Sequence, residues 1–269
     1  VPILGFGESV VISLFAFVGS VCYLLFQAGF FFRQLGKLFC QLGLLRGDGG
    51  HRRPAIIVLP GGGYHRCSKR EAEPAAFAFM KAGFDAFVLN YSVDGEGAFP
   101  GRNSWPNPLD DYEQAMSLIR SRADEWNIFP DKIAVIGFSA GGHLALCAAS
   151  MSVNRPNAAI LGYAVTSDHV KYCNASAPDA IAAVDKGTCP CFLFATRTDE
   201  TVPIINSIKL MEALDGANVP FECHIYSYGP HALSTGEKSI TDIIDFCPRY
   251  PDWVPDSIEW LRETMDITR

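Results

Sequence analysis

Residues 133–142 read IAVIGFSAGG, and this stretch decides the fold. Its first four residues are mostly β-branched and predict a buried strand, while the apolar residues 141–150 predict a helix. The pattern Gly137-x-Ser139-x-Gly141 fills the turn between them. A turn this sharp strains its central residue and leaves no room for side chains two positions away, which explains both glycines. We interpret Ser139 as a nucleophile at the carboxyl end of a strand, beside the positive end of a helix dipole.

Two other kinds of local structure can contain the same pattern of glycines around a serine. In the first, the segment is only a glycine-rich turn in which Ser139 caps the helix; the strand and helix on either side favour the nucleophile instead. In the second, the glycines bind phosphate. That function requires a G-K-[ST] motif, or a further glycine set with an acidic ribose contact, and the sequence has neither.

Strands and helices alternate along the chain after about residue 50. Short apolar runs predict strands at 55–59, 86–90, 133–136, 158–165, 192–196 and 221–226. Helical spacing predicts helices at 72–82, 109–126, 141–150, 204–214 and 257–265. This order predicts an α/β fold with a mostly parallel, doubly wound sheet flanked by helices, and ligand sites at the carboxyl ends of the strands. We expect one catalytic domain, 51–269, in which residues 166–189 pass over the site.

A triple glycine follows the strand 55–59 directly, in the sequence PGGGY of residues 60–64. Acyl transfer requires backbone N–H donors for a tetrahedral oxyanion, and glycines can turn such donors toward a site without side chains in between. The expected donors of this oxyanion hole are the amides of Gly62, Gly63 and Ala140. A turn without function is the alternative, and the position after a buried strand argues against it. Candidate substrate contacts beside this loop are Tyr64 and His65.

A serine nucleophile needs a base that is oriented by an acid, in the chain order serine, acid, histidine for this arrangement of strands. Asp199 follows the strand 192–196, and His231 follows the strand 221–226. The alternative acids are Glu200, Asp168 and Asp185. His231 alone among the six histidines follows the last strand, so we expect packing or surface roles for most of the others.

Composition limits the classes of protein that fit. The length of 269 residues suits one large domain, and a net charge of −7 argues against a nucleic-acid-binding surface. Nine cysteines are scattered, and only Cys189 and Cys191 lie close together, without a partner motif for a metal. We therefore expect no metal, and reduced core thiols in a cytoplasmic protein. The sequon at Asn174 is weak support for a secreted one.

Residues 1–50 form an apolar leader that differs from the rest of the chain. It contains five charged residues, and residues 9–32 are an uncharged run of 24, long enough to cross a bilayer. A segment that packs against the domain or at an interface is the first expectation, and a membrane anchor through 9–32 is the second. A segment foreign to the native protein is the third. A cleaved signal peptide fits less well, because the start is acidic and the apolar run is long.

Together these segments resemble the α/β-hydrolase superfamily and are most similar to its acetyl-xylan-esterase-like, xylanase-associated small esterases. The resemblance spans about residues 53–265 and rests on PGGGYHRCSKREAEPAAFAF, AFVLNYSV, IGFSAGGHLA, TRTDETVPIINSIKL and HIYSYGPHALS. It implies a catalytic triad of Ser139, Asp199 and His231, and no cofactor. The sequence departs from the wider group at Pro60, where many lipases have histidine, and at Ala232, where glycine is expected. The leader also lacks the β-rich start of such enzymes.

We therefore expect a serine carboxylic ester hydrolase that works through an acyl-enzyme. The resemblance implies small acyl groups, acetyl above all, and a small-molecule ester such as an acetylated sugar as substrate. Two alternatives stay open at this point. One is a serine peptidase of the same fold, and the other is a membrane-associated binding protein in which the triad residues are present but unused.

Overall fold

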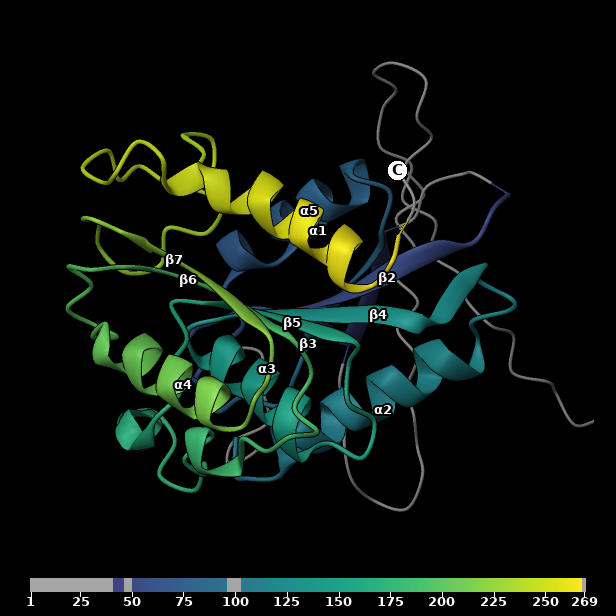
Figure 1. Ribbon diagram of the computed structural model, residues 1–269, viewed down its shortest axis with the longest axis horizontal. Coiled ribbons are helices and arrows are strands. Elements are labelled where there is room, and N and C mark those ends of the chain that lie inside the picture. The colour runs from purple at the N-terminus through teal and green to yellow at the C-terminus, as the bar shows by residue number, and fades with distance from the viewer. Residues whose placement is uncertain (1–40, 46–49, 96–102, 268–269) are drawn as a thin grey trace, which may run out of the picture.

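The computed structural model describes residues 41–45, 50–95 and 103–267, and within them seven strands form one sheet (Figure 1). The strands are β1 (Gln41–Leu45), β2 (Arg53–Leu59), β3 (Asp85–Asn90), β4 (Ile128–Phe138), β5 (Ala158–Gly162), β6 (Cys191–Thr196) and β7 (Phe221–Tyr226). Their order in the sheet is β1-β3-β2-β4-β5-β6-β7. Each neighbouring pair from β3 to β7 is parallel, and β1 alone runs antiparallel, along β3. The predicted α/β sheet is confirmed.

Helices cover both faces of this sheet. They are α1 (Glu73–Lys81), α2 (Asn107–Ser121), α3 (Ala140–Met151), α4 (Ile205–Gly216) and α5 (Trp253–Thr264). Figure 1 shows α1 and α5 on one side of the strands and α2, α3 and α4 on the other. Side chains alternate across a strand, so Ile57 of β2 joins the core on the second side and Ile56 the core on the first. Both sides of the central strands are buried, which is why these strands are apolar throughout.

Four predicted boundaries shift by three or more residues in the structure, and one of them is the start of α5, at Trp253 rather than at 257. β4 begins at Ile128, and its residues 129–132 are exposed or half-exposed and include Pro130, so the apolar pattern did not extend the strand across them. α2 ends at Ser121 rather than at 126, but Trp126 still packs against Phe87, with ring centroids 5.7 Å apart. β5 ends at Gly162 rather than at 165, because the next residue, Tyr163, has a φ of 34° and leaves the extended conformation.

β1 falls inside the segment that the sequence assigns to the apolar leader. Its backbone pairs with β3 in a regular register, Gln41 opposite Asn90 and Leu45 opposite Ala86. The sheet therefore extends into the leader, whereas residues 1–40, with the uncharged run 9–32, lie outside the described residues. In the described part of the chain, no helix is long and apolar enough to cross a membrane.

The described cysteines are all free thiols, namely Cys67, Cys147, Cys173, Cys189, Cys191, Cys223 and Cys247. Cys67, Cys173 and Cys223 are half-buried rather than in the core. The sequon residue Asn174 is buried, and its side-chain amide donates to the carbonyl oxygen of Asn103.

Candidate active site

The turn between β4 and α3 has the strained form that the sequence predicts. Ser139 has φ 53° and ψ −118°, a region that costs a residue other than glycine free energy. A Cβ atom on Gly137 would lie 2.1 Å from the carbonyl oxygen of Gly141, and one on Gly141 would lie 2.1 Å from that of Leu59. Both glycines are therefore required by close approach of backbone, and the turn presses directly against the end of β2.

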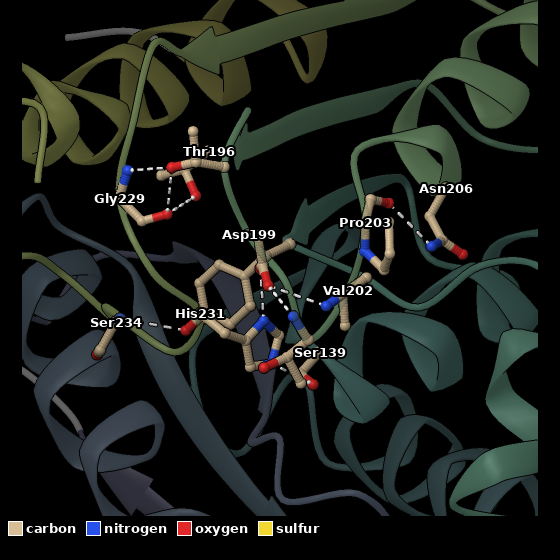
Figure 2. A network of polar contacts seen from close by, with 12 residues as sticks. Ser139, Thr196, Asp199, Val202, Pro203, Asn206, Gly229, His231 and Ser234 are labelled. Atoms are coloured by element: carbon tan, nitrogen blue, oxygen red, sulfur yellow. Dashed lines mark hydrogen bonds and ion pairs between the residues drawn. The ribbon is translucent and has the colours of Figure 1, made fainter.

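Ser139, His231 and Asp199 form one line of hydrogen bonds (Figure 2). His231 Nε2 lies 2.9 Å from Ser139 Oγ, and His231 Nδ1 lies 2.6 Å from Asp199 Oδ2. A carboxylate only accepts, so Nδ1 carries the ring proton and Nε2 is free to accept from the serine. The other carboxylate oxygen of Asp199 accepts from the backbone N–H groups of Thr201 and Val202, both at 2.9 Å. Asp199 is thus fixed from both sides, with its side chain 1% exposed.

The alternative acids lie elsewhere. Glu200 is exposed on the wall of the cleft, and Asp168 is exposed at the start of the 3₁₀ turn Asp168–Tyr172. Asp185 forms an ion pair with Arg155 at 2.9 Å. Within the described residues, Asp199 is the acid that contacts His231.

Hydrogen bonds join the loop after β6, which carries Asp199, to the loop after β7, which carries His231. The hydroxyl groups of Thr196 and Thr198 donate to the carbonyl oxygen of Gly229, at 2.7 and 3.2 Å. The N–H of Gly229 in turn donates to Thr198 Oγ1 at 2.9 Å (Figure 2). Gly229 has φ +146°, which glycine adopts without strain. These contacts fix the position of the loop that carries Asp199 relative to the loop that carries His231.

The glycine loop after β2 faces Ser139 across a cleft of about 490 Å³. Gly62 and Gly63 have φ +124° and +64°, and a Cβ atom on Gly62 would lie 2.2 Å from the carbonyl oxygen of Arg66. The backbone N–H groups of Gly62, Gly63 and Ala140 donate to no acceptor in the part of the chain that the structure describes. The cleft also contains Ser139 and His231, so unpaired donors and nucleophile share one space.

Tyr64 and His65 do not line this cleft, so the geometry gives no support to their predicted contact with substrate. Tyr64 is fully buried, and its hydroxyl lies 2.7 Å from His143 Nδ1. Burial lowers the pKa of His143 from 6.5 to about 4, against weaker opposing effects of the Pro178 carbonyl and Asp179. His143 is therefore a neutral packing residue at neutral pH, which is one of the roles expected for the histidines other than His231.

Sequence reasoning missed Tyr163, which follows β5. Its ring packs against the imidazole ring of His231 edge to face, with the ring centroids 4.9 Å apart. Its sequence context, LGYAV, is an ordinary strand end and carries no signal of this role. The described residues contain no cluster of three or more histidine, cysteine or acidic side chains arranged to hold a metal ion.

A sheet of this topology with a serine on the turn after β4 defines the class of α/β hydrolases. A solved α/β-hydrolase enzyme from a Medee basin deep-sea metagenome library is 38% identical, with a TM-score of 0.78 over 86% of this chain and 95% of that one. The chain therefore belongs to the α/β-hydrolase superfamily. Within it, the BD-FAE family model matches residues 45–155.

Two curated relatives are similar to most of this chain. An acetylxylan esterase of Xylanibacter ruminicola is 31% identical over 68% of this chain, and an endo-1,4-beta-xylanase B of Butyrivibrio fibrisolvens is 30% identical over 68%. The chain spans 41% and 33% of the lengths of these relatives.

Proposed function

We propose that this chain is a serine carboxylic ester hydrolase that acts through a covalent acyl-enzyme. The proposal rests mainly on one observation, the continuous hydrogen-bonded line from Ser139 through His231 to Asp199. A hydroxyl group is a weak nucleophile at neutral pH, and a base within hydrogen-bond distance is what activates it.

In this mechanism Ser139 Oγ attacks the ester carbonyl while His231 Nε2 takes its proton. Asp199 holds the imidazole in the productive tautomer and stabilises the imidazolium that forms. The amides of Gly62, Gly63 and Ala140 donate to the developing oxyanion. His231 then gives its proton to the leaving alcohol, and a water molecule, activated by the same histidine, releases the acid from Ser139.

The substrate that we propose is a small acyl ester, acetyl above all, on a carbohydrate. The printed names of the relatives, an acetylxylan esterase and a xylanase, support this class. The cleft supports it through its mixed character, since apolar Val165 and Val202 and charged Arg66 and Glu200 all line it beside Ser139.

The decisive experiment compares Ser139→Ala with the unmodified chain on aryl acetate, butyrate and octanoate and on acetylated xylo-oligosaccharides. We expect Ser139→Ala to lose ester hydrolysis without a change in thermal unfolding. Ser121→Ala is the matched control, because Ser121 lies exposed at the end of α2. Undiminished activity in Ser139→Ala refutes the mechanism, and equal rates from acetyl to octanoyl refute the small-acyl preference.

The same preparation separates the two alternatives. Faster hydrolysis of peptide amides than of acetyl esters would favour a peptidase. Failure of Ser139 to react with a fluorophosphonate would favour a binding protein without catalysis.

A further inference from the structure

A buried carboxylate lies at the floor of the cleft, behind the residues of the proposed triad. Glu71 ends the 3₁₀ turn Lys69–Glu71, and it is 2% exposed. Its Oε2 accepts from the backbone N–H of Gly61 at 2.9 Å, and its Oε1 accepts from the hydroxyl of Tyr163 at 2.6 Å. The oxygen of Tyr163 in turn accepts from the backbone N–H of Ser234 at 3.1 Å. Glu71 and Tyr163 together thereby connect the loop after β2, the end of β5 and the loop after β7.

Each end of this connection reaches a part of the proposed catalytic site. Gly61 immediately precedes Gly62, and a Cβ atom on Gly61 would lie 3.0 Å from Ser139 Cβ, so its backbone sits against the nucleophile. Ser234 comes three residues after His231 on the same loop (Figure 2). Tyr163, in the middle, packs against the His231 ring.

The loop that carries His231 depends on such contacts, because its backbone is strained. Ala232 and Ser234 have φ of 62° and 53°, values that residues other than glycine rarely adopt. A second bond fastens the same point to the Glu71 segment, since Ser234 Oγ donates to the carbonyl oxygen of Arg70 at 2.5 Å. The carbonyl oxygen of Ser234 accepts from Trp253 Nε1 at 3.1 Å, which leaves Ser234 held on all sides.

The hydrogen-bond roles explain why this position needs a carboxylate. Gly61 N–H only donates, and Tyr163 donates its hydroxyl proton to Glu71 because a carboxylate only accepts. A side chain that accepts at both ends satisfies both partners. An amide does not, because when its oxygen accepts from Gly61 its NH₂ group faces Tyr163, and the buried Tyr163 hydroxyl proton then loses its acceptor. Burial, reinforced by the charge of Glu71, raises the pKa of Tyr163, so the tyrosine keeps the proton that it donates.

We propose that Glu71 is a positioning residue that sets the oxyanion loop and the histidine loop relative to Ser139 through Gly61, Tyr163 and Ser234. This inference rests on the proposed ester hydrolysis and adds to it a residue that touches no substrate. Loss of the bridge removes the hold on Gly61 in the oxyanion loop and loosens Tyr163 beside His231, while the bonds of Ser234 to Arg70 and Trp253 still hold the histidine loop in part. Positions of the donors and of His231 Nε2 then spread, whereas the cleft walls that bind substrate stay in place.

Glu71→Gln tests the inference, with Glu73→Gln as the matched control because Glu73 is exposed two residues further along. Active sites are counted with a fluorophosphonate, and kcat is measured per labelled site on aryl acetate. A displacement of about 1 Å costs about 100-fold, so we expect Glu71→Gln to lower kcat per site about 10- to 100-fold. We expect KM to stay near that of the unmodified chain. A merely structural role would lower the number of labelled sites and leave turnover per site unchanged, and that result overturns the inference.

Tyr163→Phe provides a second test that removes only one hydroxyl. It keeps the ring beside His231 and should lower kcat per site in the same direction. Tyr250→Phe is its control, because Tyr250 is also fully buried and its hydroxyl has no hydrogen-bond partner among the described residues. If Glu71→Gln does not fold, Tyr163→Phe decides the question.

The double variant of Glu71→Gln and Tyr163→Phe should lose less than the product of the two single effects, because both break one chain of bonds. Independent, multiplicative losses overturn the bridge. Full activity of Glu71→Gln in a chain whose hydrolysis needs Ser139 overturns this inference alone. Absence of Ser139-dependent hydrolysis in the unmodified chain overturns both this inference and the proposed function.

Discussion

Acidification should destabilise the folded chain through one histidine, His143. This residue lies on α3, fully buried, between the Tyr64 hydroxyl at 2.7 Å and the Pro178 carbonyl oxygen at 2.9 Å. Because a carbonyl only accepts, His143 Nε2 carries the proton and Nδ1 accepts from Tyr64. The neutral ring is therefore fully satisfied, and a second proton would place a charge in the core without water.

The size of the effect follows from the pKa of His143, which is about 4 in the folded chain and 6.5 in the ordinary case. As pH falls from about 6.5 to about 4, the unfolded chain binds a proton at this residue and the folded chain does not. The free energy of unfolding therefore falls with falling pH in that window. The difference of about 2.5 pKa units corresponds to about 3 kcal/mol.

Urea unfolding at a series of pH values measures this contribution, with His143→Gln as the comparison. Glutamine keeps a donor for Pro178 but gives Tyr64 no acceptor, so we expect the variant to be about 1–3 kcal/mol less stable at neutral pH. Since it has no ionisable group at this position, its stability should fall less on acidification, and the two curves should converge near pH 4. Parallel curves would refute the reasoning, because all other titrating groups are common to both chains.

Two further predictions concern the proposed site. In Asp199→Asn, the backbone donors of Thr201 and Val202 hold the amide oxygen, so the NH₂ group faces His231 Nδ1 and imposes the wrong tautomer. The kcat on aryl acetate should therefore fall about 10,000-fold while the circular dichroism spectrum stays unchanged. A loss of kcat no larger than that of an exposed-surface variant would contradict the assignment of Asp199 as the acid. In Gly141→Ala, a Cβ atom 2.1 Å from the Leu59 carbonyl oxygen displaces the start of the oxyanion loop, so thermal unfolding should show a loss of about 1–3 kcal/mol together with reduced turnover. Gly216→Ala, at the end of α4 with nothing within 4 Å of the added atom, should lose neither; equal behaviour of the two variants would exclude the close-approach explanation.

Local patterns were sufficient for most of the fold. The strands β2, β3, β6 and β7 and the turn at Ser139 lie where the sequence predicts them, because a buried strand is apolar on both faces and a strained turn requires glycine. β1 was not predicted. Its sequence, QLGLL, has no β-branched residue, and its pairing with β3 depends on a partner more than 40 residues away in the chain.

The candidate site likewise contains residues whose positions the sequence predicts and residues whose positions only the structure determines. Asp199 and His231 follow strands, so their positions at one edge of the sheet follow from parallel topology. The choice between Asp199 and Glu200 needed the structure, since adjacent residues on a loop point in different directions. For Tyr64, a place beside the glycine loop suggested contact with substrate, whereas the fold buries its side chain in the core against His143.

The sequence by itself determined that this chain forms an α/β sheet with a serine on a strand-to-helix turn, because these features depend on residues within a few positions of one another. Only the tertiary structure decided what Glu71 does. In the sequence it belongs to the charged run KREAE and does not differ from Glu73, which stays exposed. Folding removes Glu71 from water and brings to it a hydroxyl group from 92 residues away. Burial and long-range hydrogen bonding thus gave one of two similar glutamates a place behind the proposed catalytic site.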